Sequence, residues 1–122
     1  MKKLLLPLFY LIYIINIQGQ CDYTINMNDS YGDGWNGASV DATVNGISVG
    51  SFTFTTGFFS TGTLPTYTGD IVQFSFTSGI FDNEVTFDII DPAGNNIGSY
   101  GPNPAIGLFL TDTSTSTCAV PN

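Results

Sequence analysis

Short strand-like runs, separated by turn residues at intervals of about ten residues, fill most of this chain. Apolar and polar side chains alternate within them, as in VDATV at residues 40–44, and no run has the 3.6-residue period of an amphipathic helix. About eight strands with one apolar face each predict an all-β fold, a two-sheet antiparallel sandwich of the jelly-roll kind. The strands are expected at residues 23–27, 38–44, 47–54, 61–68, 71–77, 85–90, 97–100 and 108–113.

Local signals refine this fold. Asn45-Gly46 predicts a two-residue hairpin, because a type I′ turn needs positive φ at both positions. Pro65 lacks an N–H group, so the strand that contains it should lie at a sheet edge or carry a bulge. An immunoglobulin-like sandwich is the alternative, although Cys118 lies too late in the chain for that fold's Cys–Trp–Cys spacing.

The first 20 residues resemble an export signal. Lys2 and Lys3 precede an apolar stretch at residues 4–17, and Gly19 offers a small residue for cleavage. A lipoprotein signal and a retained membrane anchor are alternatives, but Gln20 before Cys21 does not suit the first and the stretch is short for the second. We expect a secreted or cell-surface protein with a signal peptide at 1–20 and one β-sandwich module at 21–122.

The charge balance excludes several functions. The chain has 2 basic and 10 acidic residues and no histidine, and both lysines lie in the expected signal. Residues 21–122 therefore have no basic side chain with which to bind nucleic acid or an anionic membrane. Without His, Lys or Arg, the usual nucleophilic schemes are also missing, and we expect no enzyme. A hydrolase that uses two carboxylates is the remaining enzymatic alternative.

Cys21 and Cys118 bracket the expected module. In an exported chain such a pair predicts a disulfide, and free or partner-linked thiols are the alternative. Closing a loop of this length stabilises a fold by about 4 to 5 kcal/mol on the chain-entropy model.

The run DSYGDGWNG at residues 29–37 predicts a Ca²⁺ site. Asp29, Asp33 and Asn36 offer the oxygen ligands that Ca²⁺ prefers, although the spacing is not that of an EF-hand. Three glycines can shape the loop, and the single tryptophan can pack it onto the sandwich. These four residues are Gly32, Gly34, Gly37 and Trp35. A metal-free turn is the alternative, because Asp, Asn and Gly favour turns without any ion.

A second acidic turn, at residues 82–84, precedes the strand expected at 85–90. Loops gather at the two ends of a sandwich, so Glu84 or Asp82 is expected to complete the ion's shell. Two solvated turn acids are the alternative.

Phe58 and Phe59 are the best candidates for a contact patch. Two consecutive rings in an extended segment point to opposite sides, so both cannot face one core. Tyr31 and Phe81 are further candidates for exposed rings, and core packing is the alternative for all of them.

Several of these segments together resemble a known family, the "DSxGDGWNG" β-sandwich modules of secreted proteins from Bacteroidetes and marine organisms. The similarity rests on CDY at 21–23, DSYGDGWNG at 29–37, NG at 45–46, NEVTF at 83–87 and IDPAG at 90–94. It implies a cation-stabilised CUB-like or jelly-roll sandwich with an accessory extracellular binding role, and it implies no defined ligand.

These observations predict a secreted, Ca²⁺-stabilised binding or adhesion module whose partner is an extracellular glycan or protein. The ion would rigidify the loops that present the contact surface. A structural subunit of an extracellular matrix or filament, associating through sheet edges and aromatic patches, is the alternative function.

Overall fold

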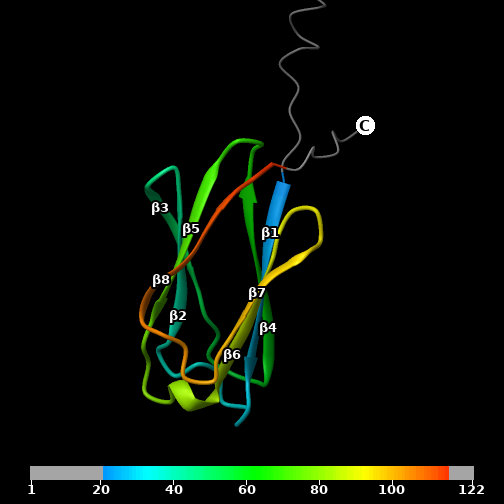
Figure 1. The fold of residues 1–122 in the computed structure, drawn as a ribbon. Coiled ribbons are helices and arrows are strands. Elements are labelled where there is room, and N and C mark those ends of the chain that lie inside the picture. Colours follow the sequence, from blue (N-terminus) through cyan, green and yellow to red (C-terminus); the bar gives the residue numbers. More distant parts are fainter. Residues whose placement is uncertain (1–20, 116–122) are drawn as a thin grey trace, which may run out of the picture.

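Figure 1 shows a two-layer β-sandwich formed by residues 21–115, the part of the chain that the computed structural model describes. The signal predicted for residues 1–20 and the cysteine at position 118 lie outside the described residues. The elements are β1 (Cys21–Asp29), β2 (Ser39–Val44), β3 (Ile47–Phe52), β4 (Phe59–Thr66), β5 (Ile71–Thr77), the short 3₁₀ turn η2 (Asp82–Glu84), β6 (Val85–Ile90), β7 (Asn96–Tyr100) and β8 (Gly107–Thr113). The predicted all-β, two-sheet antiparallel sandwich of about eight strands is confirmed.

The two sheets have the strand orders β4-β1-β6-β7 and β3-β2-β5-β8, and all neighbouring strands are antiparallel. The hairpins β2–β3 and β6–β7 stay within one sheet, and the other connections cross between the sheets. The β1–β2 connection, the segment that leads into β4 and the turn η2 consequently meet at one end of the sandwich (Figure 1).

Alternation along each strand fills the core. The inward side chains of β2, β5 and β6 were predicted from their period of two, and most are fully buried. Tyr23 of β1 packs its ring edge-on against Phe74 and donates a hydrogen bond of 2.6 Å to Asp112 of β8, which joins the two sheets. The largest fully buried side chains are Trp35, Tyr23, Phe74, Phe76, Phe87, Ile25, Met27, Ile89, Val40, Val72 and Val85.

The local turn and edge predictions also hold. Asn45 and Gly46 have φ of 52° and 81°, as a type I′ hairpin requires. Pro65 lies in β4, which is an edge strand, as predicted. A proline is tolerated there because no strand pairs with the outer side of β4 and needs a backbone N–H from it. β1 is longer than predicted and begins at Cys21, because it pairs with β4 on one side and β6 on the other.

Cys21, the first residue of β1, is buried, and the last described residues run close to it in space. The Thr66 hydroxyl donates to the Cys21 carbonyl at 2.7 Å and lies 3.1 Å from the hydroxyl of buried Ser114. The chain four residues before Cys118 therefore runs beside the first residue of β1. Because Cys118 lies outside the described residues, the disulfide remains a prediction.

Within residues 21–115, no helix is long and apolar enough to cross a membrane.

Asp41, on the outer face of β2, should make stability depend on acid pH. Its carboxylate accepts hydrogen bonds from Ser39 at 2.9 Å, from Ser51 at 2.6 Å and from Thr77. Burial alone would raise the pKa of Asp41, but these three hydroxyls outweigh it and hold the pKa below its usual value. A pKa lowered in the folded state adds stability above the unfolded-state pKa of about 3.9, and this stability is lost as pH falls through the folded-state pKa.

We expect Asp41→Asn to lower the free energy of unfolding by about 1 kcal/mol at pH 7, because the site is half-exposed. The difference from the wild type should shrink as the pH falls below about 4. Urea unfolding across this range measures it, with Asp88→Asn as the control for loss of one surface charge. An equal loss at neutral and acid pH would contradict the role of the charged carboxylate.

Candidate metal centre

The loop that follows β1 is held in shape by its glycines. Gly32, Gly34 and Gly37 all adopt positive φ, of 96°, 80° and 94°, as the loop's composition predicted. At Gly34 the backbone of the segment before β4 approaches so closely that an added Cβ would lie 2.5 Å from the Phe54 carbonyl oxygen. Only glycine meets both conditions, so the loop can lie directly against this segment.

Trp35 anchors the loop to the core, as predicted. Its side chain is fully buried and packs against the rings of Phe54 and Phe87, each with a centroid distance of 5.7 Å. The indole Nε1 donates to the carbonyl of Asn28 at 2.9 Å, so this buried polar group has a partner. The anchor thereby fixes the loop to β1 two residues after Asp33.

Asp29, the last residue of β1, organises the loop through one of its two oxygens. Oδ2 accepts hydrogen bonds from the backbone N–H groups of Gly32 at 2.6 Å, Asp33 at 2.8 Å and Gly34 at 3.1 Å. The side chain is 2% exposed, and its other oxygen, Oδ1, is buried without a hydrogen-bond partner. A buried carboxylate oxygen is costly to leave unpaired, so Oδ1 is a position at which a cation would be stabilising.

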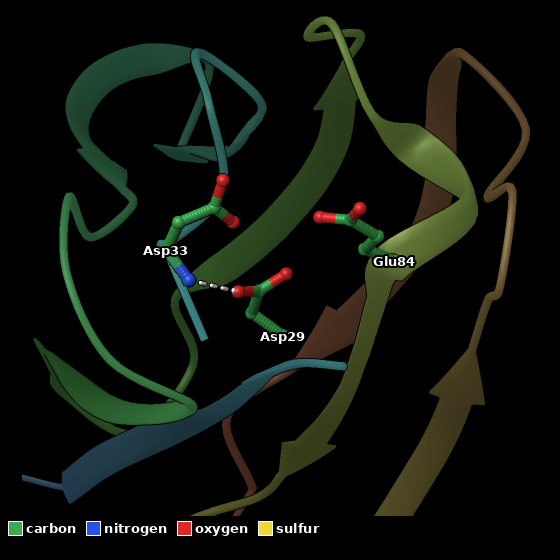
Figure 2. Close-up of side chains that lie close together, drawn as sticks. All are labelled: Asp29, Asp33 and Glu84. Carbon is green, nitrogen blue, oxygen red and sulfur yellow. Dashed lines mark hydrogen bonds between the residues drawn. The ribbon is translucent and has the colours of Figure 1, made fainter. Parts of the chain in front are cut away.

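Glu84 is brought to the same place by the turn η2. The Glu84 backbone accepts from Ser30 N–H at 3.1 Å and donates to the Phe81 carbonyl at 3.0 Å, which ties the turn to the loop after β1. Carboxylate oxygens of Asp29, Asp33 and Glu84 lie within 4.8 Å of one another. Figure 2 shows the three carboxylates pointing toward a common space, with the Asp33 N–H donating to Asp29.

The electrostatics of the three carboxylates are asymmetric. Burial favours a higher pKa for Asp29, but hydrogen bonds from backbone N–H groups, chiefly those of Gly32 and Asp33, outweigh it and lower the pKa, so this carboxylate stays charged. Burial, followed by the negative charges of Asp33 and Asp29, raises the pKa of Glu84. Glu84 Oε1 is also buried without a hydrogen-bond partner. Two unpaired oxygens in a site of like charge favour a bound cation.

The donor set fits a hard cation. Carboxylate oxygens on a loop of mixed backbone conformation suit Ca²⁺, which accepts flexible geometries with six to eight oxygens. There is no nitrogen or sulfur ligand in the cluster, so Zn²⁺ is a poor match.

Of the other two predicted ligands, Asp82 does not lie in the cluster of three carboxylates, and Asn36 lies beside one of its members. The amide nitrogen of Asn36 donates to Asp33 Oδ1 at 3.2 Å and to the Gly34 carbonyl at 3.3 Å, so it steadies Asp33, and the role of Asn36 as a ligand stays a prediction. Asp82 accepts from the Ser78 hydroxyl and, at 2.8 Å, from the Gly79 N–H, and thus closes the turn before η2. Of the two acids predicted to complete the shell, Glu84 is the one that lies with Asp29 and Asp33.

Exposed apolar side chains lie on the loops that carry the carboxylates and on the adjoining segment that leads into β4. Phe58 and Phe59, predicted as a contact patch, are 63% and 59% exposed, and the Phe58 ring lies over Gly32. Tyr31 is exposed beside Gly32, and Ile80 and Phe81 are exposed on the segment that leads into η2. Ile80 was not predicted, because an isolated isoleucine after a strand resembles a core residue. We call Tyr31, Phe58, Ile80 and Phe81 the apolar rim.

No protein-family model matches this chain, and neither does any curated protein or solved structure. The resemblance to the "DSxGDGWNG" modules stays a prediction. Function is therefore inferred from the geometry of this end of the sandwich.

Proposed function

We propose that the chain is a secreted Ca²⁺-binding β-sandwich that acts as an extracellular binding or adhesion module. The observation that carries this proposal is the buried, unpartnered Oδ1 of Asp29, which lies in a cluster with the carboxylates of Asp33 and Glu84. A divalent cation there would satisfy Asp29 Oδ1 and Glu84 Oε1 and would offset two of the three negative charges.

The ion's role in this proposal is to rigidify one end of the sandwich. Asp29 ends β1, Asp33 lies in the following loop, and Glu84 precedes β6, so one ion would join three segments of the chain. Tyr31, Ile80 and Phe81 of the apolar rim come from the same segments, and Phe58 is tied to them because its carbonyl accepts the Asp29 N–H at 2.8 Å, so the rim would be held in one arrangement. Ordering a contact surface before it binds a partner lowers the entropy cost of binding.

Composition supports binding outside the cell rather than catalysis. Residues 21–122 contain no His, Lys or Arg, which leaves few groups for acid–base or nucleophilic chemistry. The basic and apolar start of the chain and its two cysteines support export.

A second candidate function is self-association into a matrix or filament. β3 is an edge strand, and Ile47 and Val49 on it are 69% and 48% exposed. An exposed edge strand with apolar side chains can pair with another copy. Sedimentation at increasing protein concentration tests this, and a size that stays monomeric up to about 1 mM would contradict it.

Calcium is expected to stabilise the protein through this site. At a Ca²⁺ concentration about 100 times the dissociation constant, the free energy of unfolding should rise by about 2.7 kcal/mol relative to a chelator. Thermal unfolding with and without Ca²⁺ measures the shift, and calorimetric titration gives the affinity. Asp33→Asn should abolish both, whereas Asp88→Asn, which removes a carboxylate from the outer face of β6, should preserve them. An unchanged midpoint at saturating Ca²⁺ would overturn the proposal.

A further inference from the structure

We propose that the ion and the apolar rim together bind a neutral glycan, with a pair of adjacent sugar hydroxyls completing the ion's shell. This inference rests on the proposed function, because it requires Ca²⁺ at Asp29, Asp33 and Glu84. Three features of this end of the sandwich lead to it: the coordination left open, the charge of the site and the side chains around it.

The three carboxylates leave part of the shell open. Of their six oxygens, Asp29 Oδ2 accepts three backbone N–H groups and Asp33 Oδ1 accepts the Asn36 amide, so at most five are available to the ion. Ca²⁺ takes six to eight oxygens, and the remainder must come from carbonyl groups, water or a ligand. Asp29 is buried, whereas Asp33 is exposed and Glu84 is half-buried, so the site has a solvent-facing side from which a ligand can enter.

The charge of the site selects a neutral ligand. Three carboxylates and one Ca²⁺ leave a net charge of about −1, and no basic side chain is present in residues 21–122 to offset it. An anionic ligand would be repelled by this site and by the other carboxylates. A lysine or arginine of a protein partner would be attracted, but neither carries an oxygen that can ligate Ca²⁺. Sugar hydroxyls supply oxygens without adding charge.

The apolar rim provides the second half of the contact. Tyr31 and Phe58 are 72% and 63% exposed. The Phe58 ring lies over Gly32, whose N–H binds Asp29, and Tyr31 precedes Gly32 in the chain. Phe81 is 45% exposed, and its carbonyl accepts from the Glu84 N–H at 3.0 Å. Exposed rings at this position can stack on the apolar C–H face of a sugar while its hydroxyls reach the ion. Neither the ligation of the ion by hydroxyls nor the stacking on the rings would bind a sugar strongly alone, so we expect glycan binding to need both.

Retention on immobilised mannan, dextran, xylan, hyaluronan and polylysine tests the inference, with millimolar Ca²⁺ or EDTA. We expect at least one neutral polysaccharide to retain the protein in Ca²⁺ and to release it in EDTA. Tyr31→Ala and Phe58→Ala should each weaken retention roughly 3- to 10-fold while calorimetric Ca²⁺ affinity stays unchanged. Tyr67→Ala is the matched control, because this tyrosine is 47% exposed beyond the other end of β4.

The outcomes separate the two proposals. Absence of Ca²⁺ binding in the calorimeter would overturn the proposed function and this inference together. Ca²⁺ binding without retention on any neutral polysaccharide would overturn the inference alone. Preferential retention on hyaluronan, or on polylysine as a stand-in for a basic protein partner, would also overturn it. So would neutral-glycan binding that persists in EDTA.

Discussion

Trp35→Ala is expected to lower the free energy of unfolding by about 3 to 5 kcal/mol. The indole is fully buried against Phe54 and Phe87, and removing it leaves a cavity between the loop and the core. It also removes the hydrogen bond that the indole donates to the Asn28 carbonyl. Domains of this size have total stabilities of about 5 to 15 kcal/mol, so the variant should be close to unfolding at room temperature. Urea unfolding monitored by circular dichroism measures the loss, because Trp35 is the chain's only tryptophan and fluorescence would be lost with it.

Two further variants show what the indole contributes. Trp35→Phe keeps an aromatic ring but not the hydrogen bond, and should cost about 1 to 3 kcal/mol. Tyr31→Ala removes a ring that is 72% exposed in the same loop and should change stability by less than about 0.5 kcal/mol. Equal losses for Trp35→Ala and Tyr31→Ala would contradict the anchoring role. Because the anchor lies two residues from Asp33, Trp35→Ala should also weaken Ca²⁺ binding.

The fold class could be predicted because its signals are local. The alternation in residues 40–44 and 85–90, the positive-φ turn at Asn45-Gly46 and the edge position of Pro65 each depend on a few neighbouring residues. The strand order could not be predicted, because pairs such as β1–β6 and β5–β8 join segments far apart in the chain. Many pairings bury the same apolar faces, and a single sequence does not distinguish among them.

The candidate site was predictable to a similar extent. Asp29 and Asp33 follow from the density of oxygen donors and glycines in one loop. The choice between Asp82 and Glu84 depends on the turn η2, in which Asp82 accepts the Gly79 N–H and Glu84 faces Asp29. Tertiary contacts decide which of the two acids joins the cluster, and they also orient the Asn36 amide toward Asp33. Sequence composition predicts which loop supplies carboxylates, and the packing of two distant loops decides which carboxylates lie together.

Asp29→Ala is expected to lower the free energy of unfolding by about 3 to 4 kcal/mol even in the presence of a chelator. Asp29 is 2% exposed, and its Oδ2 accepts three backbone N–H groups that would lose their acceptor. Relief of repulsion from Asp33 and Glu84 offsets part of this loss. The variant should also show no response to Ca²⁺. Chemical unfolding in EDTA and in millimolar Ca²⁺ measures both effects.

Asp29→Asn separates the two roles of this side chain. The asparagine amide oxygen can replace Oδ2 and accept the same three N–H groups. The amide nitrogen would then replace Oδ1 and could donate to Glu84 Oε1, which has no hydrogen-bond partner in the wild type. In a chelator this variant should therefore stay within about 1 kcal/mol of the wild type, as should Asp33→Asn. Neither should bind Ca²⁺. If Asp29→Asn were as unstable as Asp29→Ala, the negative charge itself would hold the loop; if it still responded to Ca²⁺, the ion would lie elsewhere. A stable variant without a Ca²⁺ response would assign Oδ2 to the loop and Oδ1 to the ion.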